Sequence, residues 1–122
     1  MNWDICVHPD RKYIEVKTNG ILDNDNSLKM AKEIAKTMRS NRIKRAVIDH
    51  KDIQAIKGEV FEIYERPKIL KLLGALFGIK IAEVIKKEDK DHFSFLETVC
   101  NNNGYSFATF YDKQKAIEWL LK

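Results

Sequence analysis

The spacing of hydrophobic residues changes along this chain from a period of two to a helical period, and this change restricts the fold most. Apolar and polar residues alternate over residues 3–8 and again over residues 13–18. A period of two is typical of a half-buried strand. The next apolar residues are three or four positions apart, which predicts an amphipathic helix; they are Leu28, Ala31, Ile34, Ala35 and Met38.

The rest of the chain continues this alternation of strands and helices. A short apolar run at residues 46–48 is typical of a strand covered on both faces, so we place it at the centre of the sheet. A second helix is expected over residues 58–77, with a kink or break at Pro67, because proline lacks the amide hydrogen of a helix interior. The remaining elements are a strand at 79–85, a helix that is capped within residues 88–91 and ends at Gly104, a strand at 105–110 and a helix capped by Asp112.

The predicted order of elements is therefore ββαβαβαβα. The first two strands are close enough in sequence to pair as an antiparallel hairpin, whereas strands joined through helices are parallel. We expect an α/β fold with a five-stranded, mostly parallel (mixed) sheet, four main helices and an antiparallel first strand. A length of 122 residues fits a single domain over residues 1–122.

Composition narrows the class of protein. The longest nearly apolar run, residues 72–79, is far shorter than the roughly 20 residues of a transmembrane helix, so no membrane span is expected. The N-terminal residues lack the basic and apolar regions of a signal peptide. Cys6 and Cys100 are too few for a disulfide scaffold, which favours a reducing cytoplasm.

The sequence shows no motif for catalysis, cofactor binding or metal binding. Glycine-rich phosphate loops and the nucleophile elbow do not occur. The three histidines and two cysteines also lack the local spacing that zinc sites usually show. We therefore expect a protein that is not an enzyme and that needs neither a cofactor nor a metal.

The densest group of ionisable residues follows the predicted central strand and consists of Asp49, His50, Lys51 and Asp52. Ligands of open α/β sheets bind at the carboxyl ends of the strands, so this group has the best position for a functional site. A solvated loop, in which Asp49 bonds nearby backbone amides, explains the same residues more simply.

A second charged group is basic and contains Arg39, Arg42, Lys44 and Arg45. These cations lie where the first helix ends, and cations offset the negative end of a helix. A phosphate-binding patch is the alternative interpretation. The net charge is only +4 and no aromatic residues interleave the cations, so binding to nucleic acid is not expected.

The second predicted helix and the residues just after it carry more apolar residues than a single stripe against a sheet needs. Three interpretations stay open: a surface for a protein partner or a second copy of the chain, a groove for a lipophilic ligand, or a kinked helix that packs two faces. The residues concerned are Ile63, Tyr64, Ile69, Leu70, Leu72, Leu73, Leu76, Phe77 and Ile79.

The order of elements resembles the STAS superfamily, the domains of sulphate-transporter tails and anti-sigma-factor antagonists. Gly20-Ile21-Leu22-Asp23 is similar to the family's step into the first helix, and Ala46-Val47-Ile48-Asp49 is similar to its central strand. Residues 93–99 and 116–120 resemble small, stand-alone, mostly uncharacterised bacterial STAS-like proteins. The resemblance implies a single STAS-like domain that is regulatory and binds a protein partner.

The resemblance also implies where such a domain is switched. In the family, an Asp-Ser-Ser/Thr-Gly segment opens the second helix, and phosphorylation of a hydroxyl controls partner binding. Here the aspartate falls at about Lys57 and the serine pair at about Gly58 and Glu59, and no hydroxyl lies between Asp49 and Tyr64. A switch by serine phosphorylation at this point is therefore not expected, and Glu59 is explained by the dipole of a helix start.

The candidate surface for a protein partner, for self-association or for a lipophilic ligand such as an acyl chain or isoprenoid combines these regions. It consists of Asp49, His50, Lys51, Asp52, Lys57, Gly58, Glu59, Phe61 and Tyr64.

Overall fold

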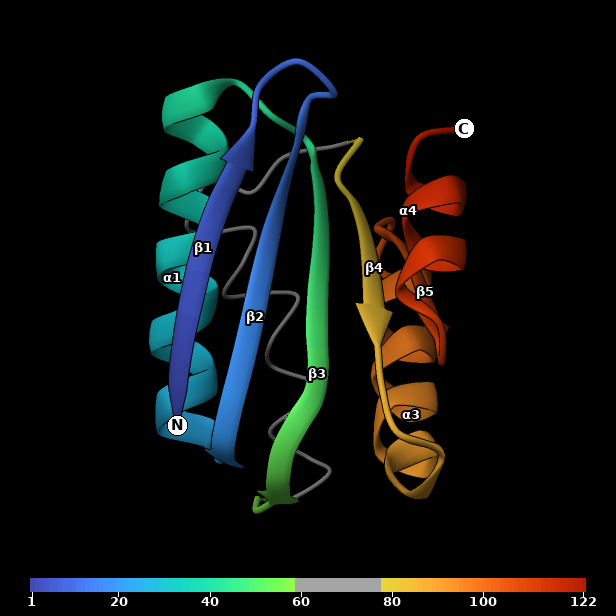
Figure 1. Cartoon of the computed structure of the whole chain (residues 1–122). Helices are drawn as coiled ribbons and strands as arrows, with labels where there is room; N and C mark the ends of the chain where they lie inside the picture. The colour runs from blue at the N-terminus through green and yellow to red at the C-terminus, as the bar shows by residue number, and fades with distance from the viewer. Residues whose placement is uncertain (59–77) are drawn as a thin grey trace.

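The computed structural model describes residues 1–58 and 78–122 (Figure 1). The elements are β1 (Asn2–His8), β2 (Tyr13–Leu22), α1 (Asn24–Asn41), β3 (Arg45–Ile56), β4 (Lys80–Val84), the short 3-10 helix η1 (Lys87–Asp89), α3 (Lys90–Asn102), β5 (Ser106–Phe110) and α4 (Lys113–Leu120). Three of the four predicted helices are thus found in the described part. The second predicted helix falls on residues 59–77, outside the described residues.

The five strands form one mixed sheet in the order β1-β2-β3-β4-β5. β1 pairs antiparallel with β2 through a hairpin that joins His8 to Tyr13. β2, β3, β4 and β5 are parallel to one another. The predicted sheet, its antiparallel first strand and the central position of the third strand are confirmed.

Helices cover both faces of the sheet. In Figure 1, α1 lies beside β1 and β2, whereas α3 and α4 lie beside β4 and β5. Alternate residues of β3 divide between two apolar clusters: Ala46 and Ile48 pack with residues of α1 and α3, and Val47 packs with Ala116 and Leu120 of α4. The sheet is therefore buried on both faces, as parallel strands require.

Local capping explains where the helices begin and end. Asp23 accepts a hydrogen bond from the backbone amide of Asn26 (2.8 Å), and Asp112 accepts one from Gln114 (2.8 Å). These carboxylates satisfy amides that have no partner within the helix. Gly104, just after α3, has φ +89°, the left-handed conformation predicted for it. In the described part, no helix is both long and apolar enough to cross a membrane.

The predicted ends of two strands are wrong. β2 continues through Gly20 to Leu22, and β3 continues through the predicted loop to Ile56. The two extensions pair with each other as far as Leu22 and Ile56, so the backbone groups of this polar stretch are satisfied by a ladder. The group from Asp49 to Asp52 is therefore part of a strand and not a solvated loop.

β3 also carries a bulge within this group. Between the pairs Lys17–Asp49 and Asn19–Asp52, β3 has one more residue than β2. The Oδ1 atom of Asp49 accepts a hydrogen bond from the amide of Lys51 (3.0 Å) at this irregularity. A bulge changes which face of the sheet the following side chains occupy.

Candidate functional site

The structure does not bring the predicted ionisable group together, because successive residues of a strand point to opposite faces. Asp49 lies on the face of α4, where it is 9% exposed. A hydrogen bond with Glu15 raises the pKa of Lys113 in α4, and the Asp49 carboxylate acts in the same direction. His50 points the other way, into the core beneath α1 and α3.

The other predicted residues lie along the exposed end of β3. Lys51 is exposed, and Asp52 forms a surface ion pair with Lys17 (3.4 Å between Nζ and Oδ2). Such an exposed pair contributes little stability. Lys57 and Gly58 are exposed just after the strand. Glu59, Phe61 and Tyr64 lie outside the described residues.

A buried polar network crosses three strands on the face of α1 and α3. Nδ1 of His50 lies 2.8 Å from the hydroxyl oxygen of Thr18, and Nε2 lies 3.3 Å from Oε2 of Glu83. The side chains of His50 and Glu83 are only 2% and 6% exposed. The ring of His50 also stacks on Phe93 of α3, with 5.1 Å between ring centroids.

Thr18 links His50 to the backbone of β3. Its hydroxyl donates a hydrogen bond to the carbonyl oxygen of Asp49 (3.1 Å) and lies within hydrogen-bonding distance of Nδ1 of His50. On the other side of the ring, Nε2 faces the carboxylate of Glu83 at 3.3 Å. The three side chains therefore form a continuous row of polar contacts across β2, β3 and β4.

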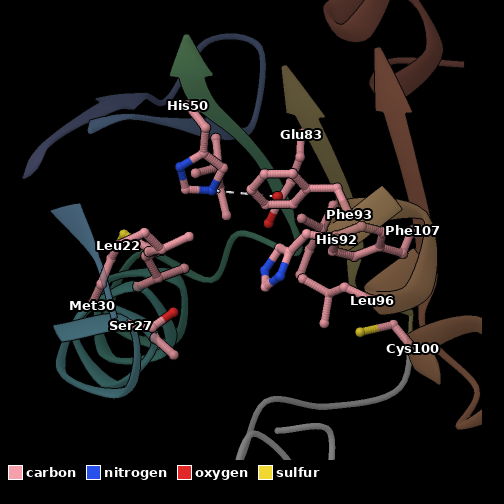
Figure 2. Close-up of a pocket in the computed structure, with 14 residues that line it drawn as sticks. Leu22, Ser27, Met30, His50, Glu83, His92, Phe93, Leu96, Cys100 and Phe107 are labelled. Carbon is pink, nitrogen blue, oxygen red and sulfur yellow. Dashed lines mark ion pairs between the residues drawn. The ribbon is translucent and has the colours of Figure 1, made fainter. Parts of the chain in front are cut away.

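The network borders a small apolar cavity between α1 and α3. Figure 2 shows His50 and Glu83 facing each other at the sheet, with α1 and α3 on either side of the space. The cavity has a volume of about 60 Å³. Its lining consists of Leu22, Ser27, Met30, Ala31, Ile34, Ile48, His50, Ile81, Glu83, His92, Phe93, Leu96, Cys100 and Phe107.

Glu83 brings an incompletely bonded polar atom to this cavity. Its Oε2 atom is buried and makes no hydrogen bond of good geometry to any residue in the described part, although it lies next to His50. A buried carboxylate is stable only when a charge or hydrogen bond compensates it. Among the described residues, His50 is the group placed to compensate the buried carboxylate of Glu83.

Sequence reasoning missed Thr18 and Glu83. Glu83 stands between apolar neighbours in a short parallel strand, where both faces are covered. Because glutamate is almost never fully buried unless it is paired, a charged residue within such a strand was a usable signal. Thr18 gave no comparable signal, since threonine is common in strands.

Comparison with known proteins gives matches among solved structures alone. No protein-family model matches the sequence, and no curated protein matches it. An uncharacterized protein of the DUF3478 family from Shewanella loihica PV-4, described as having a SpoIIAA-like fold, matches with a TM-score of 0.60 and 21% identity, over 98% of this chain and 92% of that chain.

Two structures of SpoIIAA match as well. The anti-sigma factor antagonist SpoIIAA in its unphosphorylated form has a TM-score of 0.57 and 10% identity, over 97% of this chain and 96% of that chain. The Bacillus cell fate determinant SpoIIAA in its phosphorylated form has a TM-score of 0.50 and 10% identity, over 97% and 98%. The chain has the SpoIIAA-like fold, so the resemblance to the STAS superfamily is confirmed at the level of the fold.

Proposed function

We propose that this chain is a non-enzymatic regulatory domain that acts by binding a protein partner. The observation that carries this proposal is the SpoIIAA-like fold, because one matched protein of that fold is an anti-sigma factor antagonist. The partner surface proposed for this chain is the carboxyl end of β2 and β3 with the residues that follow.

The shape of this end suits an interface. The last pair between β3 and β4 joins Asp49 to Val84, so β3 extends beyond β4 together with β2. Ile21 on this extension is 38% exposed, which is unusual for a large apolar residue in the described part. Ile21 pairs with Ala55 of β3, and the exposed residues Asp52 and Lys57 lie before and after Ala55 in the chain. An apolar centre with a polar rim is the usual composition of a protein interface.

The buried histidine supports a role without catalysis. A general base needs a free nitrogen to activate a nucleophile. Both ring nitrogens of His50 face side chains of the sheet: Nδ1 lies 2.8 Å from the Thr18 hydroxyl, and Nε2 lies 3.3 Å from the Glu83 carboxylate. Ser27 and Cys100 line the same cavity, whereas the two ring nitrogens of His50 are directed at Thr18 and Glu83.

Regulation in this chain differs from a serine switch. Because no hydroxyl lies between Asp49 and Tyr64, we propose that partner binding is controlled without phosphorylation at that point. Treatment of the purified chain with phosphatase is then expected to leave partner binding unchanged.

A quantitative pull-down with variants tests the partner surface. We expect Ile21→Asp and Lys57→Glu to weaken capture of the partner by at least about tenfold, since both change the proposed interface. Lys36→Glu, an exposed change on α1 away from this end, is the matched control and should keep the partner. Failure of the wild-type chain to capture a protein, or equal capture by all variants, contradicts the proposal.

A second candidate function is the carriage of a small lipophilic ligand. The apolar lining of the cavity between α1 and α3 favours it. The volume of about 60 Å³ argues against a whole acyl chain or isoprenoid in that cavity, because ligand pockets usually measure roughly 300 Å³ or more. Native mass spectrometry after gentle purification decides: a bound lipid supports this function, and its absence leaves the protein-binding proposal as the better one.

A further inference from the structure

A concave basic surface lies at the opposite end of the sheet, where the parallel strands begin. It is open, with a volume of about 400 Å³, and is lined by Lys12, Arg42, Ile43, Lys44, Arg45 and Gly78. Lys12 comes from the β1–β2 hairpin, and the other cations follow α1 in the chain. We call Lys12, Arg42, Lys44 and Arg45 the cationic cup. No acidic residue of the described ranges lines it.

In the described part of the chain, the four cations have no acidic partner. Over residues 1–58 and 78–122, the basic residues in ion pairs are His8, Lys17, His50, Lys86 and Lys113, and none of them belongs to the cationic cup. The neighbouring strand β4 begins with another cation, Lys80. Burial lowers the pKa of Lys80, and the positive charges of Arg45 and Lys122 lower it further. Within the described ranges, no carboxylate therefore pairs with the charges of the cup.

The backbone conformation fixes the positions of two of these cations. Lys12 (φ 57°) and Arg42 (φ 55°) are the non-glycine residues with positive φ in the described part, and both line the cup. This conformation favours glycine, because a side chain there is strained. A cation at Arg42 offsets the negative end of α1, but that explanation does not apply to Lys12 in the hairpin. Both strained positions present a cation to the same concavity.

We propose that the cationic cup binds the clustered phosphates of a small molecule, such as an organic diphosphate or triphosphate. Guanidinium groups bind phosphate oxygens in pairs, and lysines add point charges, so these four side chains suit a compact ligand with several negative charges. Aromatic residues that would stack on bases do not line the cup, which favours a small phosphate compound over a nucleic acid. The site lies away from the proposed partner surface and is independent of it.

Titration calorimetry with inorganic triphosphate tests the proposal. Lys12→Gly and Arg42→Gly remove one cation each at positions where glycine suits the backbone, so both variants should fold. We expect each to weaken triphosphate binding about tenfold, the usual effect of losing one charged hydrogen-bonding group. Arg42→Lys keeps the charge but loses the paired hydrogen bonds, so its affinity should lie between those of the wild-type chain and Arg42→Gly. Lys36→Ala, which removes an exposed cation of α1 outside the cup, should have no effect.

Two further ligands distinguish the sources of phosphate. Orthophosphate should bind at least about tenfold more weakly than triphosphate, because it engages fewer cations. A short oligothymidylate should bind more weakly than triphosphate. The proposal is overturned if triphosphate does not bind the wild-type chain, or if both glycine variants bind triphosphate as tightly as the wild-type chain does. It is also overturned if the wild-type chain binds oligothymidylate more tightly than triphosphate.

Discussion

Charged side chains are buried or paired toward the carboxyl end of the sheet, but they are solvated at its amino end. Toward the carboxyl end, His50 and Glu83 are buried and face each other at 3.3 Å, and Lys17 pairs with Asp52 at the surface. At the amino end, the cations of the cationic cup stay exposed to solvent or half-buried and have no carboxylate partner within the described ranges.

This difference separates charges that serve the fold from charges that are available to a ligand. A buried charge must be satisfied inside the protein, or its desolvation destabilises the folded state. Solvated cations need no partner within the protein, although their mutual repulsion raises the free energy of the folded state slightly. The comparison can be tested by removing charges at each end.

The largest effect is expected at the buried pair. His50→Leu leaves Glu83 without its partner in the core, so this variant should lose about 3 kcal/mol of unfolding free energy. Urea denaturation measures the loss. Lys51→Leu, a change at the exposed next residue, should alter stability much less.

The double variant His50→Leu/Glu83→Leu sharpens this prediction. Replacing both partners by apolar residues should restore most of the lost stability, because no uncompensated charge is left. If the double variant is as unstable as the sum of the two single variants, the pair does not act as a unit and the comparison between the two ends loses its basis.

The next effect concerns the strained backbone of the cationic cup. Arg42→Gly and Arg42→Ala both remove the cation, but only glycine suits a φ of 55°. The glycine variant should therefore be more stable than the alanine variant by about 1 kcal/mol. Thermal unfolding of the two variants side by side measures the difference, and equal midpoints would contradict the strain assigned to Arg42.

The smallest effect is a pH dependence of the unfolding free energy, which arises from the ion pair of Lys113 on the α4 face. Glu15 raises the pKa of Lys113 above its ordinary value of 10.5. A raised pKa stabilises the folded state while the lysine is protonated, so this contribution is complete below pH 10.5 and is lost as the pH rises through the raised pKa.

Lys113→Met should therefore lose less stability than the wild-type chain when the pH is raised through this range. The difference should stay below about 1 kcal/mol, because the lysine is partly exposed. Urea denaturation at neutral and alkaline pH measures it, with Lys115→Met as the exposed control. An equal alkaline loss in wild type and Lys113→Met would show that the pair with Glu15 contributes nothing.

Most of the fold was predictable from the sequence, because hydrophobic period and capping residues act locally. The alternation in β1 and the cap at Asp112 gave the correct elements. The length of β3 was not predictable in the same way. Its polar half, including Asp52, is held in a strand by pairing with β2, which is a contact between distant parts of the chain.

The sites were less predictable, since they depend on which face of the sheet a residue occupies. His50 was expected in a solvated loop, but it lies in the core, where its ring nitrogens face Thr18 and Glu83. Three cations of the cationic cup were recognised as a basic group, whereas Lys12 was not, because the hairpin brings it there from a distant position in the sequence.

The most direct test of this division of charge is a two-dimensional amide NMR titration of the whole chain with inorganic triphosphate. We predict saturating shifts for the amides of Lys12, Arg42, Lys44 and Arg45, while those of Lys51 and Asp52 stay in place. Saturating shifts at Lys51 and Asp52, or no saturating shift at the cationic cup, would contradict the proposal that the amino end of the sheet binds phosphate.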